Sequence, residues 1–207
     1  MIAVIDYGRG NLFSIGQALK QLGAPFQITG DPEKILEAER LILPGVGAFA
    51  DAMNVINSRG LGDAVTKAAA KETPLLGICL GMQLLASGSE EFGEWPGLDL
   101  IPGTVKRLPE GDGSLMSTRI PNVGWRTLIP TSGSIIDDIP GKDMVYFQHS
   151  YAFQTTDPKH TIGTIEINGG SAVAAVQSKN IIGFQFHPEK SGERGLSLLR
   201  RFLDFPN

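Results

Sequence analysis

The sequence has only one cysteine, Cys79, among its 207 residues. A single cysteine cannot form a disulfide within the chain. The opening residues MIAVID also lack the basic segment and small-residue cleavage site of a signal peptide. Proteins without disulfides are typical of reducing compartments. We therefore expect this protein to work in the cytoplasm.

The sequence also lacks a large excess of either basic or acidic residues, and it contains no long hydrophobic run. The 18 basic residues are outnumbered by 22 acidic ones, so the net charge of −4 leaves no basic surplus to neutralise nucleic-acid phosphates. No run in the sequence approaches the roughly 20 apolar residues that a membrane-spanning helix needs. The sequence predicts neither a nucleic-acid partner nor a membrane partner.

The residue patterns that bind metals and nucleotides are incomplete. A single cysteine excludes the Cys-x-x-Cys pairs of closed zinc sites. The Gly8-Arg9-Gly10 sequence begins like a dinucleotide-binding loop, but Phe13 stands where the third glycine is needed. A phosphate loop ending in Gly-Lys-Ser/Thr is absent from the sequence as well. We expect no metal and no cofactor.

Short aliphatic runs alternate with helical spacing in the first half of the chain. Asn11 is expected to cap the first helix, whose apolar residues recur at steps of three and four. Such alternation is typical of helices packed on a mostly parallel sheet. The predicted strands are Ile2–Ile5, Pro25–Thr29, Arg40–Leu43 and Pro74–Ile78, and the predicted helices cover residues 12–22, 48–57, 61–71 and 82–86.

Beyond about Gly103 the pattern changes to short alternating runs separated by Gly, Pro, Asn and Asp. Strands are predicted at Thr104–Leu108, Trp125–Ile129, Met144–Gln148, His160–Ile167, Ala172–Gln177 and Ile181–Phe186, and a closing helix at Gly192–Phe205. The length suits one domain. We therefore predict an α/β fold: a single-domain, three-layer sandwich with a central, mostly parallel mixed sheet flanked by helices.

The strongest chemical signal is the segment Gly77–Gly81, GICLG, between a predicted strand and a predicted helix. Flanking glycines allow a sharp strand-to-helix turn that exposes a nucleophile, here Cys79, and the amide of Leu80 can stabilise an oxyanion. A helix N-terminus also favours a thiolate. The competing interpretation is a buried core cysteine between two chance glycines.

A nucleophilic thiol needs a base, and the sequence offers three histidines. His160 follows a loop-like stretch and is expected to be a solvated surface residue. His149 ends an apolar run, so it can either line a site or cap a strand. His187 ends the predicted strand Ile181–Phe186, and ligand sites in open α/β sheets lie at the carboxyl ends of strands. His187 is therefore the best candidate for the base.

Glu189 lies two residues beyond His187, a spacing that places both side chains on one side of an extended segment. A carboxylate there can hold the imidazole in one orientation. Together, Cys79, His187 and Glu189 provide a nucleophile, its base and the group that orients the base, which is the arrangement needed for acyl transfer. The alternative is that Glu189 is an ordinary surface charge.

Two blocks of sequence, Pro74–Gln83 (PLLGICLGMQ) and Phe184–Lys190 (FQFHPEK), resemble the nucleophile and His/Glu blocks of the class I, or triad, glutamine amidotransferases. The resemblance extends over essentially the whole chain and implies one amidotransferase domain of flavodoxin-like fold over residues 1–207. It implies that Cys79 attacks the side-chain amide of glutamine. It also implies that His187 transfers the proton to the departing ammonia and that Glu189 orients His187.

The same resemblance implies further roles. Val46 would supply a second backbone N–H to the oxyanion hole beside Leu80. The residues that would contact the bound glutamine are Gly47, Gln83, Glu91, His149, Ser150 and Tyr151.

Within the family, three segments are similar to the glutaminase subunits of imidazole glycerol phosphate synthases: Pro44–Phe49, Asn122–Trp125 and His149–Tyr151. This similarity implies a heterodimer with a (β/α)₈-barrel cyclase of histidine biosynthesis that receives the ammonia. Interface candidates are Asn11, Trp125 and Lys190. Trp125 has core packing as an equal alternative. Arg9 departs from the smaller residues of some relatives.

Two other functions remain open on the sequence. A free-standing cysteine hydrolase of γ-glutamyl substrates would need no partner. A binding subunit that kept the fold and lost the chemistry is disfavoured because Cys79, His187 and Glu189 are all present.

Overall fold

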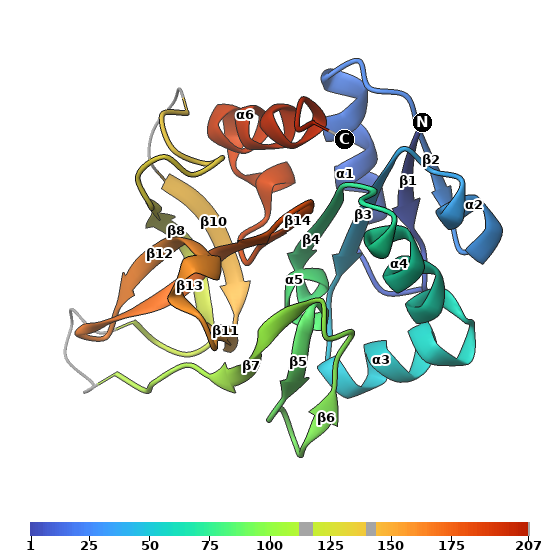
Figure 1. Cartoon of the computed structure of the whole chain (residues 1–207). Helices are drawn as coiled ribbons and strands as arrows, with labels where there is room; N and C mark the ends of the chain where they lie inside the picture. The colour runs from blue at the N-terminus through green and yellow to red at the C-terminus, as the bar shows by residue number, and fades with distance from the viewer. Residues whose placement is uncertain (112–117, 140–143, 207) are drawn as a thin grey trace.

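The computed structural model describes residues 1–111, 118–139 and 144–206. Its centre is a sheet of eight strands in the order β2-β1-β3-β4-β14-β13-β12-β9 (Figure 1). The strands are β1 (Ile2–Ile5), β2 (Phe26–Thr29), β3 (Arg40–Gly45), β4 (Leu75–Cys79), β9 (Ile129–Pro130), β12 (Thr161–Ile167), β13 (Gly170–Ser178) and β14 (Ile181–Phe184).

The sheet is parallel in one half and antiparallel in the other. Strands β2, β1, β3, β4 and β14 pair in parallel, whereas β13, β12 and β9 extend the sheet with antiparallel pairs. Because β3, β4 and β14 run side by side in the same direction, their carboxyl ends meet at one edge. This arrangement confirms the predicted mixed, mostly parallel central sheet.

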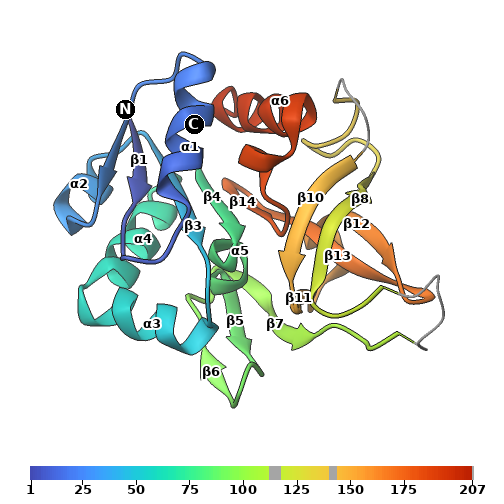
Figure 2. The same cartoon turned by 180° about the vertical axis from the view of Figure 1, so that it is seen from behind.

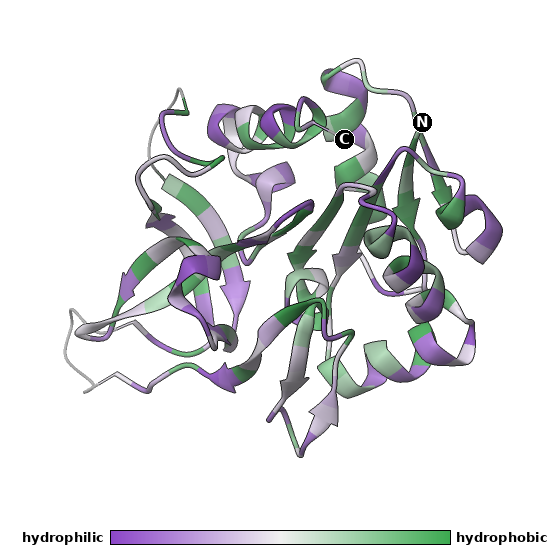
Figure 3. Ribbon diagram, viewed as in Figure 1, coloured by the Kyte–Doolittle hydropathy of each residue, from purple (hydrophilic) through white to green (hydrophobic). Residues whose placement is uncertain are grey.

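Helices cover both faces of the parallel half (Figures 1 and 2). On strand β1, Ile2 and Val4 pack into a cluster with α1 (Leu12–Gln21) and α6 (Gly192–Leu203). The alternate residues Ala3 and Ile5 pack into a second cluster with the helices α2 (Pro32–Leu36), α3 (Phe49–Ser58) and α4 (Leu61–Ala70). Burial on both faces explains why the central strands read as unbroken hydrophobic runs (Figure 3).

Two smaller sheets stand beside the central one. One contains β11 (Tyr151–Thr155), β7 (Ile101–Arg107), β5 (Ala86–Ser89) and β6 (Trp95–Pro96), and the other pairs β8 (Asn122–Thr127) with β10 (Met144–His149). Short helices complete the fold: α5 (Leu80–Leu84), η1 (Pro158–His160) and η2 (Pro188–Lys190). Among the described residues, no helix is long and apolar enough to cross a membrane.

Several predicted boundaries are wrong. The expected strand 125–129 is two strands, because the chain leaves β8 after Thr127 and joins β12 through β9. Strand β14 ends at Phe184 rather than Phe186: the Gln185 amide still donates to Ala174 of β13, but the His187 amide donates to Tyr146, outside the central sheet. The helix expected at 82–86 begins two residues earlier, directly after Cys79.

Candidate active site

Cys79 lies at a sharp turn between β4 and α5. Its backbone has φ +55° and ψ −111°, a conformation that side chains rarely adopt. The turn is tight because its two glycines touch other backbone: a Cβ on Gly81 would collide with the carbonyl of Leu43, and one on Gly77 would lie 2.7 Å from the Gly81 oxygen. This strained turn holds the thiol at the carboxyl end of the central strand.

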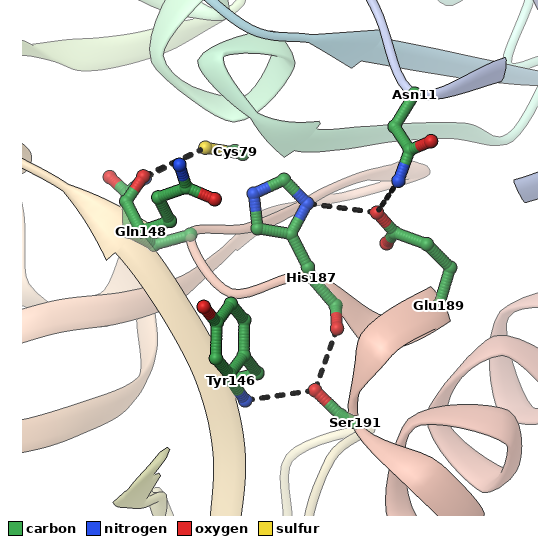
Figure 4. A network of polar contacts seen from close by, with 8 residues as sticks. Asn11, Cys79, Tyr146, Gln148, His187, Glu189 and Ser191 are labelled. Carbon is green, nitrogen blue, oxygen red and sulfur yellow. Dashed lines mark hydrogen bonds and ion pairs between the residues drawn. The ribbon is translucent and has the colours of Figure 1, made fainter. Parts of the chain in front are cut away.

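His187 and Glu189 come from the segment that follows β14. The Nδ1 atom of His187 lies 2.9 Å from Oε1 of Glu189, and their side chains are 3% and 0% exposed. Figure 4 shows the imidazole between Cys79 and Glu189. Burial lowers the pKa of His187, but hydrogen bonds and negative charge from Cys79 and Glu189 outweigh burial and raise the pKa to about 9. The site therefore favours the protonated imidazole.

Hydrogen bonds on both sides hold His187 and Glu189 in place (Figure 4). The Ser191 hydroxyl donates to the His187 carbonyl over 2.6 Å and accepts from the Tyr146 amide over 2.9 Å. Asn11 donates from Nδ2 to the Glu189 carboxylate over 3.4 Å. Asn11 is the N-cap residue of α1, as predicted, but its side chain makes no capping hydrogen bond and contacts Glu189 instead.

A cavity of about 370 Å³ opens over Cys79. Ten of the residues that the sequence analysis singled out line it: Val46, Gly47, Cys79, Leu80, Gln83, Glu91, His149, Ser150, Tyr151 and His187. Five others were not predicted: Phe92, Arg107, Pro121, Val123 and Gln148. The small sheets supply one wall of this cavity and the carboxyl ends of β3 and β4 supply another.

His149 is buried and lines this cavity, which settles the question left open by its sequence position. Its Nδ1 lies 2.8 Å from the carbonyl of Tyr151 and its Nε2 lies 2.9 Å from the amide nitrogen of Asn122. Burial is the main cause that lowers the pKa of His149 to about 4. His149 is therefore neutral at pH 7, with Nδ1 as the donor and Nε2 as the acceptor.

Two glutamine side chains link the walls of the cavity. Gln83 donates from Nε2 to the carbonyl of Tyr151 over 2.9 Å and to Oε1 of Gln185 over 3.0 Å. Gln185 in turn directs its Nε2 at the sulfur of Cys79, 3.9 Å away. Gln185 was not predicted as a site residue. It lies two residues before His187 in an extended segment, so the spacing alone places both side chains on the same side of that segment.

Glu91 connects the cavity to α3. Its Oε2 accepts a hydrogen bond of 2.6 Å from the amide of Phe49, the first residue of that helix. Just before the helix, Val46 is 43% exposed and Gly47 has φ +102°, with open space where a side chain would lie. The Val46–Gly47 segment is thus a loosely packed part of the cavity wall.

The remaining candidates lie outside the cavity. The indole of Trp125 packs edge to face on Tyr146, and Lys190 places its Nζ 5.8 Å from the centre of the same ring. Core packing is the wrong alternative for Trp125, because this residue is 46% exposed. His160 lies in η1 and is half-buried rather than fully solvated. The described residues contain no cluster of three or more metal-ligating side chains.

A family model described as "Glutamine amidotransferase class-I" matches residues 3–204. The chain belongs to the class-I glutamine amidotransferases. Enzymes of this family hydrolyse glutamine.

Two named relatives are similar over nearly the whole chain. The protein named imidazole glycerol phosphate synthase subunit HisH of Moorella thermoacetica is 48% identical, over 97% of this chain and 93% of its own. An Arabidopsis thaliana protein named imidazole glycerol phosphate synthase hisHF, chloroplastic, is 45% identical over 98% of this chain and 34% of its own.

Among solved structures, one described as a crystal structure of glutamine amidotransferase matches with a TM-score of 0.75 and 20% identity. The match covers 99% of this chain and 98% of that one. It shows the shared fold.

Proposed function

We propose that this amidotransferase is the glutaminase subunit of an imidazole glycerol phosphate synthase. It hydrolyses glutamine and passes the ammonia to a cyclase subunit that makes imidazole glycerol phosphate and an aminoimidazole carboxamide ribotide in histidine biosynthesis. The observation that carries the proposal is the placement of His187 between Cys79 and Glu189 beside a cavity (Figure 4), in a chain 48% identical to a HisH subunit.

In this mechanism the thiolate of Cys79 attacks the amide carbon of the glutamine side chain. The protonated His187 gives its proton to the leaving nitrogen, so ammonia departs and a thioester remains. His187 then takes a proton from water, which attacks the thioester and releases glutamate. The proton taken up by His187 restores the starting state. The sum is glutamine plus water to glutamate plus ammonia, and it requires no cofactor.

Negative charge develops on the amide oxygen during both attacks. The backbone N–H groups of Leu80, at the start of α5, and of Val46 are the proposed donors to this oxygen. A raised pKa at His187 supports this mechanism, because it keeps a proton ready for the leaving nitrogen.

The shape of the cavity suits glutamine. Glu91 lies on its wall and offers a carboxylate to the positively charged amino group of the substrate. The proposed contacts to the rest of the bound glutamine come from Gly47, Gln83, His149, Ser150 and Tyr151. Neutral His149 adds no charge beside the cavity, because its pKa is about 4.

The proposed assembly is a heterodimer in which one amidotransferase domain, residues 1–207, docks on a (β/α)₈-barrel cyclase. The fused relative supports this pairing, because this chain accounts for a third of a single protein that carries the synthase name. Asn11, Trp125 and Lys190 are the proposed contacts. A nucleophilic thiol works in a reducing compartment, so the cytoplasm is the proposed location.

A pair of histidine variants tests the proposed triad. In the complex with the cyclase subunit, His187→Asn is expected to lower glutamate release by several orders of magnitude, because Cys79 loses its proton donor and acceptor. His160→Asn changes the same residue type outside the cavity and should leave the rate unchanged. The measurement is the rate of glutamate formation at saturating glutamine. Equal losses in the two variants would contradict the assignment of His187.

A further inference from the structure

Tyr7 has a buried hydroxyl group that the proposed mechanism does not use. The residue follows β1, is 2% exposed and packs in the same apolar cluster as Leu43, Phe49 and Leu80. No group among residues 1–111, 118–139 and 144–206 forms a hydrogen bond with its hydroxyl. A buried hydroxyl without a partner destabilises the fold, so a conformation that supplies an acceptor is favoured.

The Tyr7 hydroxyl lies close to Gly45 and to the turn between β4 and α5 that contains Cys79. A Cβ built on Gly45 would collide with this hydroxyl and would lie 2.9 Å from both the Gly81 amide nitrogen and the Leu80 Cβ. Tyr7 is nevertheless not among the residues that line the cavity. The hydroxyl of Tyr7 therefore lies against Gly45, at the end of β3, and outside the cavity.

The hydroxyl group is also a permanent donor. Burial, followed by the negative charge of Cys79, raises the pKa of Tyr7 far above its usual value. Tyr7 keeps its proton at every pH at which the enzyme works. It can donate a hydrogen bond to a carbonyl oxygen that reaches it.

The segment that follows Gly45 has room to move. The backbone of Gly81 is fixed, because even a Cβ there would strike the Leu43 carbonyl. The chain after Gly45 is free by comparison, since Val46 is 43% exposed and Gly47 has open space around it. Glycines on either side of Val46 let the intervening peptide groups turn at little cost.

We propose that Tyr7 is a positioning residue for the oxyanion hole, and this inference rests on the proposed function. When the Gly45–Val46 peptide turns its N–H towards Cys79, its carbonyl must point the opposite way, because the two groups are trans across a planar unit. The Tyr7 hydroxyl lies against Gly45 and outside the cavity, where this carbonyl can reach it. Tyr7 then donates a hydrogen bond to the Gly45 carbonyl and keeps the Val46 N–H directed at the amide oxygen of the substrate.

The test is Tyr7→Phe, which removes the hydroxyl and keeps the ring. In the complex with the cyclase subunit and its ribotide ligand, we expect kcat for glutamate formation to fall about tenfold, the effect of one buried hydrogen bond. The KM for glutamine should not change. Because the hydroxyl has no partner in the structure described, the melting temperature should stay constant or rise.

Alkylation of Cys79 by iodoacetamide supplies the control, because that reaction forms no oxyanion. Tyr7→Phe should leave the alkylation rate unchanged, whereas a disturbed triad would slow it. Tyr7→Leu also removes the buried ring and should lower the melting temperature.

Two results would overturn the inference. One is an unchanged kcat in Tyr7→Phe. The other is a loss of kcat accompanied by slower alkylation and a lower melting temperature, which would mean that Tyr7 only supports the fold. A wild-type complex that releases no glutamate would instead refute the proposed function, so the two failures are distinguishable.

Discussion

His187 and His149 both line the cavity above Cys79, yet their environments shift their pKa values in opposite directions. Both imidazoles are buried, which disfavours the charged form. His187 has negative partners in Cys79 and Glu189 that reverse the effect, whereas the partners of His149 are the uncharged Tyr151 carbonyl and Asn122 amide. One histidine therefore holds a proton at neutral pH and the other does not.

The raised pKa of His187 makes stability depend on pH. Its pKa is about 9 in the folded state and 6.5 in the ordinary state, so the folded chain holds this proton more tightly. The resulting stabilisation is fully present below pH 6.5 and is lost as pH rises through 9. Glu189→Gln removes one cause of the shift.

We expect the difference in free energy of unfolding between wild type and Glu189→Gln to shrink as pH rises from 6.5 to 9. Chemical denaturation at about pH 6, 7.5 and 9.5 measures this difference. A difference that stays constant over the range would show that Glu189 does not stabilise a protonated imidazole.

At the scale of elements, the site depends on the close contact of β3 with the start of α5. Backbone packs against backbone there at Leu43, Gly45, Gly77 and Gly81, and the pairing of Gly45 with Cys79 places the end of β3 beside the candidate nucleophile. The turn at Cys79 and the end of β3 are therefore packed tightly against each other. The Val46–Gly47 segment, which follows β3 and lines the cavity, is packed more loosely.

Gly81→Ala tests this contact. The added methyl would collide with the Leu43 carbonyl, and since both partners are backbone, we expect a loss of at least about 3 kcal/mol in the free energy of unfolding. Gly170→Ala is the control, because its methyl would meet only the Ile167 oxygen at 3.8 Å, and its effect should stay below about 0.5 kcal/mol. Denaturant titration compares the two variants. Similar stabilities would contradict the tight turn at Cys79.

The sequence predicted those elements in which the order of hydrophobic and polar residues shows which side chains are buried. Central strands such as β4 are apolar on both faces, and α6 keeps its apolar residues on one side, so both were predictable. Strand β5 has the sequence ASGS and β6 has only two residues, so neither carries a hydrophobic alternation. Strand β5 forms through pairing with β7, and β6 through pairing with β5, and no local pattern indicates either pairing.

The candidate site was predictable to a similar extent. Cys79 and His187 lie at or near the ends of predicted strands, and Glu189 lies two residues beyond His187. These positions made all three predictable from the sequence. Gln148 contributes its backbone carbonyl, 3.8 Å from the Cys79 sulfur, and no side-chain pattern can reveal a carbonyl contact.

At the scale of the whole molecule, a half-exposed patch continues from the triad to the outer surface. Glu189 accepts a hydrogen bond from Asn11. Ser191 forms hydrogen bonds with both His187 and Tyr146. The ring of Tyr146 in turn contacts Trp125 and Lys190. The proposed partner contacts are thus connected, through these direct contacts, to His187.

Trp125→Ala tests whether this patch is the interface. Trp is a frequent binding hot spot, so we expect the dissociation constant for the cyclase subunit to rise by about thirtyfold or more, with little change in melting temperature. Ile28→Ala is the matched control, because Ile28 is also 46% exposed but lies on β2, at the far edge of the sheet. Titration calorimetry and thermal unfolding give both quantities. A large drop in melting temperature with unchanged binding would make Trp125 a purely structural residue.

The most direct measurement of the central claim is glutamate formation from glutamine under three conditions: the chain alone, with the cyclase subunit, and with that subunit plus its ribotide ligand. Cys79→Ala serves as the blank in each. The account predicts activity that is strongest in the third condition and absent from the blank. Full activity of the chain alone would instead indicate a free-standing cysteine hydrolase, and activity that survives in Cys79→Ala would contradict the nucleophile itself.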